Sequence, residues 1–230
     1  MAELIAIVGE SGSGKTSSVR NLNPEETFII STTGKRPGIK GASKKYPNFV
    51  IKDGKISGNF YASSNVDKIG TVLQLIDKKM PHIKTVICDD YQYVMGFEAM
   101  DRAKEKSYDK FTDIAQHAYQ VLKAAMNMRD DLNVVILTHS ENIGDNVTPM
   151  YRMKTLGKML NSVITLEGLF TYVLFTTILR NDDGKAQYKF ITNSDGSCTA
   201  KTPMGLFEDL YIDNDIDYVV KQIKKYNEEE

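Results

Sequence analysis

The sequence predicts an α/β fold of three layers, in which helices cover both faces of a mainly parallel central sheet. Short apolar blocks that end at polar residues alternate with segments of helical periodicity along most of the 230 residues. In the last third, two extended segments follow one another across a strong turn signal, so an antiparallel hairpin should be added to the sheet. The length suits one domain, which we expect to span residues 1–230.

The first expected elements are a buried strand at residues 4–8 and a helix from Lys15 to about Asn21. The apolar run LIAIV is typical of a parallel strand that is covered on both faces. Between the two elements, the octapeptide GESGSGKT at residues 9–16 fits the pattern G-x-x-x-x-G-K-[ST]. Because a strand precedes it and a helix follows it, a chance match by a glycine-rich turn is the weaker interpretation.

The octapeptide predicts a phosphate-binding loop whose ligand is Mg-ATP. Its glycines let the backbone curl so that successive N–H groups point at phosphate oxygens, beside the positive end of the helix. Lys15 should reach the β- and γ-phosphates and act in catalysis, and the Thr16 hydroxyl should ligate Mg²⁺. The expected nucleotide-binding residues are Gly9, Glu10, Ser11, Gly12, Ser13, Gly14, Lys15 and Thr16.

A second strand at residues 27–31 leads into the densest basic segment of the chain, residues 32–46. Lys35, Arg36 and Lys40 lie there among glycines, which suits a flexible clamp on the phosphates of nucleic acid. The alternative is a solvated loop, as most charge runs are. Nearby aromatic residues could stack on bases or lie in the core. They are Tyr46, Phe49, Phe60 and Tyr61.

Two carboxylates follow the third buried strand, which we expect at residues 85–88. Before this strand come a polar hairpin or irregular strand at residues 48–62 and a helix that is closed by Pro81. A phosphate loop needs a carboxylate at the end of a neighbouring strand to orient Mg²⁺, so Asp89 is the expected second metal ligand. Asp90 stands where a general base could activate the attacking water.

A further strand at residues 134–137 stops at His139-Ser140, after two helices between about residues 96 and 128. A polar side chain at such a strand end can contact the γ-phosphate or the lytic water. His139 is therefore a candidate catalytic residue, and His139 and Ser140 are candidate sensors of the bound nucleotide. The alternative is a local cap formed by Ser140.

The last third of the chain should begin with a short helix at residues 154–162. Extended segments at residues 169–179 and 187–192 are joined by the sequence NDDG, which is a strong hairpin signal. A final helix should run from Asn214, as its N-cap, to Tyr226.

The composition is that of an ordinary soluble protein, with 41% hydrophobic residues, 26% charged residues and a net charge of -1. A nucleic-acid site would therefore have to be a local basic face. Cys88 and Cys198 lack metal-ligand spacing, and we expect free thiols in a cytoplasmic protein. Glu3 and the phosphate motif leave no room for an export signal, and the apolar stretch 163–179 is rich in β-branched residues, so we expect no membrane partner.

The order of GESGSGKT, the strand end VICDD and the strand end LTHSEN resembles the RecA-like core ATPases. More closely, the chain looks like the small phage-encoded AAA-type ATP-binding proteins that are grouped with Sak-type single-strand annealing proteins. Three further segments carry this closer resemblance, namely YDKFT at residues 108–112, LGK at residues 156–158 and AKTPMG at residues 200–205. The phosphate-loop match is specific to the superfamily only.

The resemblance implies an ATPase that uses ATP and Mg²⁺ and acts on single-stranded DNA in phage recombination, annealing or replication, in the host cytoplasm. It also implies assembly into a ring or filament with ATP at the subunit interfaces. By this analogy, Lys201 would reach the γ-phosphate bound to a neighbouring subunit. The loop at residues 142–154, with Arg152 and Lys154, would contact DNA.

One position departs from the RecA-like pattern. RecA-like enzymes commonly carry a catalytic Glu at the end of the strand next to the phosphate loop, where this sequence has Ser31-Thr32-Thr33. Turnover would then be slow, or rest on Asp90. Two other functions stay open, a nucleotide-controlled binding module for a protein partner and a small-molecule kinase. The kinase is the weaker one, because the arginines are scattered along the chain and form no closing lid.

Overall fold

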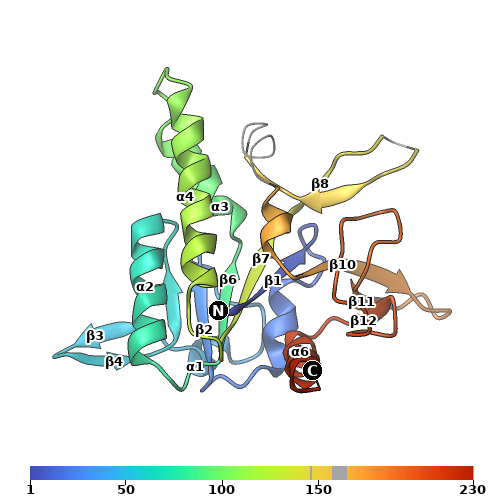
Figure 1. The fold of residues 1–230 in the computed structure, drawn as a ribbon, viewed down its shortest axis with the longest axis horizontal. Helices are drawn as coiled ribbons and strands as arrows, with labels where there is room; N and C mark the ends of the chain where they lie inside the picture. The colour runs from blue at the N-terminus through green and yellow to red at the C-terminus, as the bar shows by residue number, and fades with distance from the viewer. Residues whose placement is uncertain (146, 157–164, 230) are drawn as a thin grey trace.

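The computed structural model describes residues 1–145, 147–156 and 165–229, and an eight-stranded sheet forms its centre (Figure 1). Its strands are β1 (Glu3–Val8), β2 (Thr27–Ser31), β5 (Phe60–Ala62), β6 (Thr85–Asp89), β7 (Asn133–Thr138), β10 (Tyr172–Arg180), β11 (Ala186–Ile191) and β12 (Tyr211–Asp213). Their order is β12-β11-β10-β1-β7-β6-β2-β5. The pairs from β10 to β5 are parallel, and β11 and β12 add an antiparallel edge. The predicted mixed α/β class with a mostly parallel sheet is therefore confirmed.

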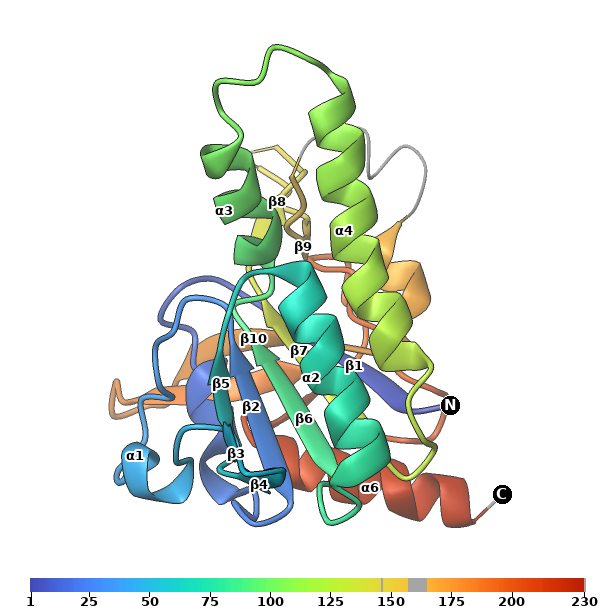
Figure 2. The same ribbon diagram turned by 90° about the vertical axis from the view of Figure 1, so that its left-hand side faces the viewer.

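Helices cover both faces of the sheet (Figure 2). They are η1 (Thr16–Asn21), α1 (Ala42–Lys45), α2 (Val66–Lys79), α3 (Gln92–Asp101), α4 (Asp109–Met126), η2 (Leu166–Leu169) and α6 (Ile216–Glu228). Alternate residues of β1 point to opposite faces, as strand geometry requires. Leu4, Ala6 and Val8 join the core beneath α2 and α4, whereas Ile5 and Ile7 join the core beneath η1 and α6.

The strand that ends in Asp89 is not the immediate neighbour of the strand before the phosphate loop. β7 lies between β1 and β6, and it pairs with both in parallel. The prediction that the strand before Asp89 lies next to the strand before the phosphate loop is therefore wrong. Because parallel strands all end at the same edge of the sheet, Asp89 still reaches the loop across the end of β7.

Three element boundaries differ from the sequence-based expectations. The segment at residues 48–62 contains the expected hairpin, β3 (Val50–Lys52) and β4 (Lys55–Ser57), but its end, β5, joins the main sheet beside β2. Helix α3 begins at Gln92, four residues before the expected start, because it follows directly from Asp90-Tyr91. The first helix is a short 3-10 turn that begins at Thr16.

The C-terminal part departs further from the prediction. Asn214 does not cap α6. The N-cap is Asp215, whose Oδ1 accepts a hydrogen bond from the Asp217 N–H at 3.0 Å. The predicted helix at residues 154–162 lies outside the described residues from 157 onward, and residues 154–156 are not helical. A strand was expected from residue 169, but η2 ends there and β10 starts at Tyr172.

A second small hairpin follows β7 where a loop was expected. It pairs β8 (Ser140–Asn142) with β9 (Tyr151–Met153) in antiparallel fashion. Both cysteines are buried free thiols, as expected. None of the helices in the described part of the chain combines the length and the apolar character that crossing a bilayer requires.

Candidate functional site

The glycine-rich loop connects β1 to η1 at the edge where the parallel strands end. Gly9 lies directly against β10, since a Cβ at this position would be 1.7 Å from the Thr176 Oγ1. The Gly9 N–H donates to the carbonyl of Thr138 at 3.1 Å, and the Ser140 N–H donates to the Gly9 carbonyl at 3.2 Å. Gly14 has a φ of 92°, a left-handed conformation that glycine adopts without strain. The loop is thus fixed by its neighbours on both sides.

Lys15 lies folded over this loop. Its Nζ donates to the carbonyls of Gly9 at 2.8 Å and Glu10 at 2.7 Å, and the residue is only 5% exposed. Burial lowers the pKa of Lys15, while the nearby Asp90, Asp89 and Glu10 carboxylates oppose this shift. An ammonium group has three N–H donors, so the two loop carbonyls leave one for an anion in the loop.

Thr16 and Asp89 form the arrangement expected of a Mg²⁺ site. The Thr16 hydroxyl donates to the Asp89 Oδ1 at 3.1 Å. Asp89 is 4% exposed, and burial, helped by the Asp90 charge, raises its pKa to about 6. Within the described residues no group of three or more His, Cys, Asp or Glu side chains could hold a metal. Mg²⁺ needs only one or two protein oxygens when phosphates and waters complete its shell, so this pair fits the ion.

Asp90 adopts a strained backbone conformation at the end of β6. Its φ of 62° is left-handed, which is uncommon for a residue other than glycine and costs about 1–3 kcal/mol. Two threonines after β2 hold it there. The Thr32 hydroxyl donates to the Asp90 carbonyl at 2.6 Å, and the Thr33 hydroxyl donates to its Oδ2 at 3.2 Å. The segment that lacks the expected Glu therefore orients Asp90 instead.

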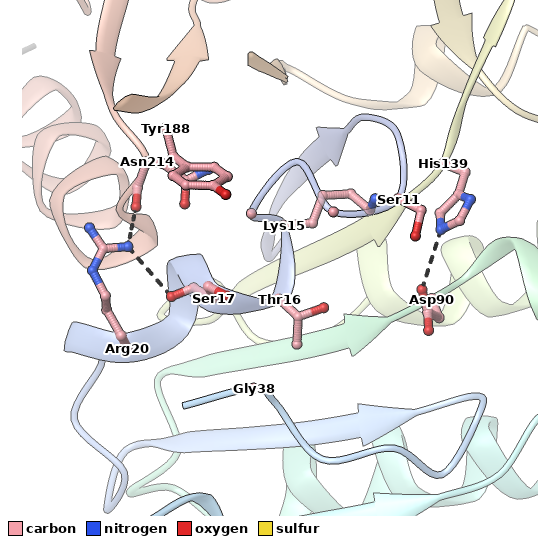
Figure 3. A pocket seen from close by; sticks show the side chains of 12 residues that line it. Ser11, Lys15, Thr16, Ser17, Arg20, Gly38, Asp90, His139, Tyr188 and Asn214 are labelled. Atoms are coloured by element: carbon pink, nitrogen blue, oxygen red, sulfur yellow. Dashed lines mark hydrogen bonds and ion pairs between the residues drawn. The ribbon is translucent and has the colours of Figure 1, made fainter. Parts of the chain in front are cut away.

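His139 lies beside Asp90 at one end of the cavity (Figure 3). Its Nε2 lies 3.7 Å from the Asp90 Oδ1, and burial, together with the Lys15 charge, lowers its pKa. A neutral imidazole at pH 7 follows from that shift. The side chain of Gln92, which sequence reasoning missed, accepts hydrogen bonds from the His139 N–H and the Thr138 hydroxyl, both at 3.2 Å. Ser140 does not line the cavity, and its N–H supports the loop.

Lys15, Thr16, Asp90 and His139 line one cavity of about 660 Å³ (Figure 3). Its lining is Ser11, Gly12, Gly14, Lys15, Thr16, Ser17, Arg20, Gly38, Asp90, His139, Tyr188 and Asn214. Asp89 contacts Thr16 but is not part of the lining. Sequence reasoning missed Tyr188 and Asn214, because they come from the antiparallel part of the fold and no local motif connects them with the loop.

The basic residues that we expect to contact DNA differ in their exposure and in their contacts within the protein. Lys35 and Lys40 are exposed. Arg36 instead donates to the carbonyl of Tyr46 and to the side chain of Asn48, and its guanidinium lies 4.2 Å from the centroid of the Phe60 ring. Its contacts therefore hold the basic loop in place. Tyr46 and Phe60 are buried, so the core alternative holds for these two rings.

The other residues to which the resemblance assigns a role, namely Arg152, Lys154 and Lys201, lie outside the cavity. The Arg152 Nε forms an ion pair with the Glu141 Oε1 at 2.8 Å, within the β8–β9 hairpin. Lys154 is exposed, and its N–H donates to the carbonyl of His139 at 2.8 Å. Lys201 is exposed, and its backbone pairs with that of Val173 in β10.

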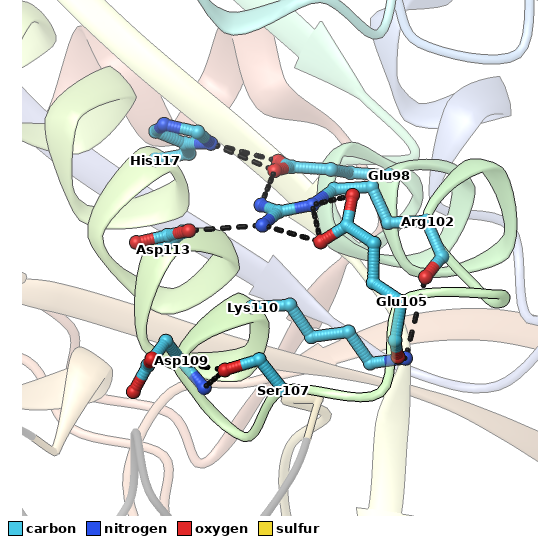
Figure 4. Close-up of polar contacts among 8 residues, drawn as sticks. All are labelled: Glu98, Arg102, Glu105, Ser107, Asp109, Lys110, Asp113 and His117. Carbon is cyan, nitrogen blue, oxygen red and sulfur yellow. Dashed lines mark hydrogen bonds and ion pairs between the residues drawn. The ribbon is translucent and has the colours of Figure 1, made fainter.

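A separate polar cluster joins α3 to α4 (Figure 4). The Arg102 guanidinium contacts carboxylates of Glu98, Glu105 and Asp113, each at 2.9 Å. His117 also contacts Glu98 at 2.9 Å, so it lies in an ion-pair network and does not face the cavity. Solvent screens partly exposed ion pairs of this kind, so each contributes little to stability, and we assign the cluster to the packing of the two helices.

Comparisons with known proteins identify no family for this chain. No family model matches it, and no curated protein matches it. Among solved structures it is similar to the ATPase DotB from Legionella pneumophila, with 10% sequence identity and a TM-score of 0.36. The alignment covers 97% of this chain and 52% of DotB, so the chain spans about half the length of that protein. A likeness at this level carries no conclusion about activity, which has to be inferred from the site itself.

Proposed function

We propose that this protein is a RecA-like P-loop ATPase that binds Mg-ATP and acts on single-stranded DNA in phage recombination, annealing or replication. The observation that carries the nucleotide part is the joint placement of three side chains. Lys15 lies over the loop with one N–H left for an anion, and the Thr16 hydroxyl meets the Asp89 carboxylate at 3.1 Å. A phosphate and its metal ion need these groups in this arrangement.

Hydrolysis would depend on how the chain's own residues position a water molecule. When bound, Mg²⁺ would neutralise charge that develops on the phosphate oxygens. Asp90 is held by Thr33 and lies beside His139, so its carboxylate can accept a proton from a water that contacts both side chains. Lys15 would stabilise negative charge on the γ-phosphate. The shorter side chain of Asp, in place of the usual Glu, is the reason to expect slow turnover.

The proposed link to DNA rests on two basic segments that contain or contact residues of the cavity wall. The loop with Lys35 and Lys40 also supplies Gly38 to the cavity wall. Lys154 is bonded through its N–H to His139 at the opposite wall. A nucleotide that changes the position of Gly38 or His139 would move these lysines, and so change the affinity for DNA phosphates.

Self-assembly is the part of the proposal that involves Lys201. This residue is exposed and does not line the cavity of its own chain, so any contact with ATP has to be made in a neighbouring subunit. A ring or filament with ATP between subunits would allow that contact.

The direct test compares the rate of ATP hydrolysis with and without single-stranded DNA, and the particle size with Mg-ATP under the same two conditions. We expect DNA to raise the rate and to produce larger particles. The binding to DNA should weaken as salt is raised, because lysines contact phosphates. Equal rates, unchanged particle size and no salt-sensitive binding would contradict the role on DNA.

A second candidate is a nucleotide-controlled binding module with little hydrolysis. It is favoured by one observation: Asp90 is the single carboxylate among the described residues that line the cavity. This candidate predicts tight ATP binding, a conformational response and no effect of Asp90→Asn on complexes with a protein partner.

A further inference from the structure

The cavity continues beyond the phosphate loop to an end that the octapeptide does not form. Tyr188, Asn214 and Arg20 gather at this end, whereas Asp90 and His139 lie at the opposite end, with the phosphate loop between them (Figure 3). If the proposed function holds, the γ-phosphate faces Asp90. The nucleoside part of the ligand then extends towards Tyr188.

Tyr188 presents an aromatic ring directly beside the loop. A Cβ at Gly14 would lie 2.9 Å from the Tyr188 Cδ1, so the ring approaches a position that only glycine can occupy. Tyr188 is nonetheless 46% exposed. A ring that is supported on one side and open on the other offers a surface on which a planar base can stack.

Asn214 supplies an independent observation at the same end. The residue is 2% exposed, and its side-chain Nδ2 has no hydrogen-bond partner among the described residues. Its backbone is satisfied, because the Asn214 N–H donates to the Tyr188 carbonyl at 3.3 Å and its carbonyl accepts from the Arg20 guanidinium. A buried amide without a partner is unfavourable, and an acceptor on a ligand would relieve this cost.

We infer that this end of the cavity binds the nucleotide base and that it selects adenine. The inference rests on the proposed function, since it concerns the same ligand. The Tyr188 ring stacks on the base, and the Asn214 amide offers a donor and an acceptor side by side. This pair matches the N7 acceptor and the N6 amino group of adenine, whereas guanine presents two acceptors at the same edge.

Calorimetric titration with Mg-ATP, Mg-GTP and magnesium tripolyphosphate tests this assignment. The wild type should bind ATP at least about tenfold more tightly than GTP. Tyr188→Ala should weaken ATP binding about tenfold and leave tripolyphosphate binding unchanged, while Tyr188→Phe keeps the ring and the affinity. Asn214→Leu, which removes both the donor and the acceptor of the amide at a similar size, should reduce the preference for ATP over GTP. The matched control is Tyr211→Ala, which removes a tyrosine of β12 that is 40% exposed and outside the cavity.

The outcomes separate this inference from the proposed function. If Tyr188→Ala and the wild type bind ATP equally well and neither prefers ATP to GTP, the base site is wrong, although ATP binding stands. If the wild type binds neither ATP nor tripolyphosphate, the proposed function fails and the inference fails with it. Should Asn214→Leu not fold, the comparison of Tyr188→Ala with Tyr188→Phe still decides the role of the ring.

Discussion

The two ends of the cavity are built in different ways. At the phosphate end, groups from one octapeptide meet the ends of parallel strands, and the key side chains are buried: Lys15 is 5% exposed and Asp89 is 4% exposed. At the other end, Tyr188 is 46% exposed, and it meets Asn214 only through the antiparallel edge of the sheet. In the function that we propose, the first end would bind the phosphates that every nucleotide carries, and the second end would distinguish one base from another.

The largest expected effect is a loss of ATP affinity when the phosphate loop loses its lysine. Lys15→Ala removes the ammonium group from the loop, and we expect at least about a 100-fold loss of ATP affinity, because charged hydrogen bonds are among the strongest in proteins. The loss should be the same for GTP and for tripolyphosphate. Calorimetric titration measures it, with Lys185→Ala in the exposed hairpin turn as the matched control. Wild-type affinity in Lys15→Ala would overturn the central assignment of this site.

Asp90→Asn should leave phosphate binding intact and remove the proton acceptor. We expect ATP affinity to change little, while kcat falls about 100-fold or more, as removal of a general base predicts. Steady-state ATPase assays beside binding measurements make this comparison. The control is Asp101→Asn, at an exposed aspartate at the end of α3. An unchanged kcat would favour the nucleotide-controlled binding module over the enzyme.

Asp89→Asn should stabilise the protein when nucleotide and Mg²⁺ are absent. Burial raises the pKa of Asp89 from 3.8 to about 6, so the folded state binds this proton more tightly than the unfolded state. The stability contribution is therefore present below pH 4 and lost as the pH rises through 6. At pH 8, the variant should gain about 1–3 kcal/mol in the free energy of unfolding, and the gain should shrink towards pH 4.

Urea unfolding at pH 8 and pH 5 measures this gain, with the exposed turn variant Asp182→Asn as the control. The same Asp89→Asn protein should lose the Mg²⁺ dependence of its ATP binding. A variant that is less stable than the wild type at pH 8 would show that Asp89 contributes contacts that outweigh the cost of burying its charge.

The contrast between the two ends also explains what the sequence could predict. The phosphate loop is encoded by eight consecutive residues, and buried parallel strands give continuous apolar runs, so the loop, β1, β6 and β7 were predictable. Asp89 could be named as a candidate because it follows such a run. The order of the strands was not predictable, since the insertion of β7 between β1 and β6 depends on packing that no local pattern records.

No local sequence pattern predicted the end of the cavity that Tyr188 and Asn214 form. Asn214 precedes a helix, and a helix N-cap was the natural interpretation, but Asp215 takes that role one residue later. Tyr188 lies in the exposed first half of β11, where an exposed tyrosine is ordinary. Only the pairing of β11 with β10 and of β12 with β11 brings these residues to the loop. Long-range antiparallel pairing is the kind of information that periodicity does not contain.

The smallest expected effect tests whether the Tyr188 ring presses on the phosphate loop at Gly14. Gly14→Ala places a Cβ 2.9 Å from the Tyr188 ring at a φ of 92°, and Gly12→Ala introduces a similar backbone strain, at a φ of 80°, with no atom within 4 Å. Each should lower the free energy of unfolding by about 1–2 kcal/mol through the left-handed conformation alone. Only Gly14→Ala should lose more through the clash with the ring.

A double-mutant cycle isolates that contact. We expect Tyr188→Ala to recover about 0.5–1 kcal/mol when it is combined with Gly14→Ala, and to add independently when it is combined with Gly12→Ala. Urea unfolding without nucleotide supplies the four free energies for each cycle. Additivity in both cycles would mean that the ring does not press on the loop. Coupling in the Gly14 cycle alone would mean that the residue which lets the loop curl around phosphate also sets the position of the ring, so that a change at one end of the cavity is felt at the other.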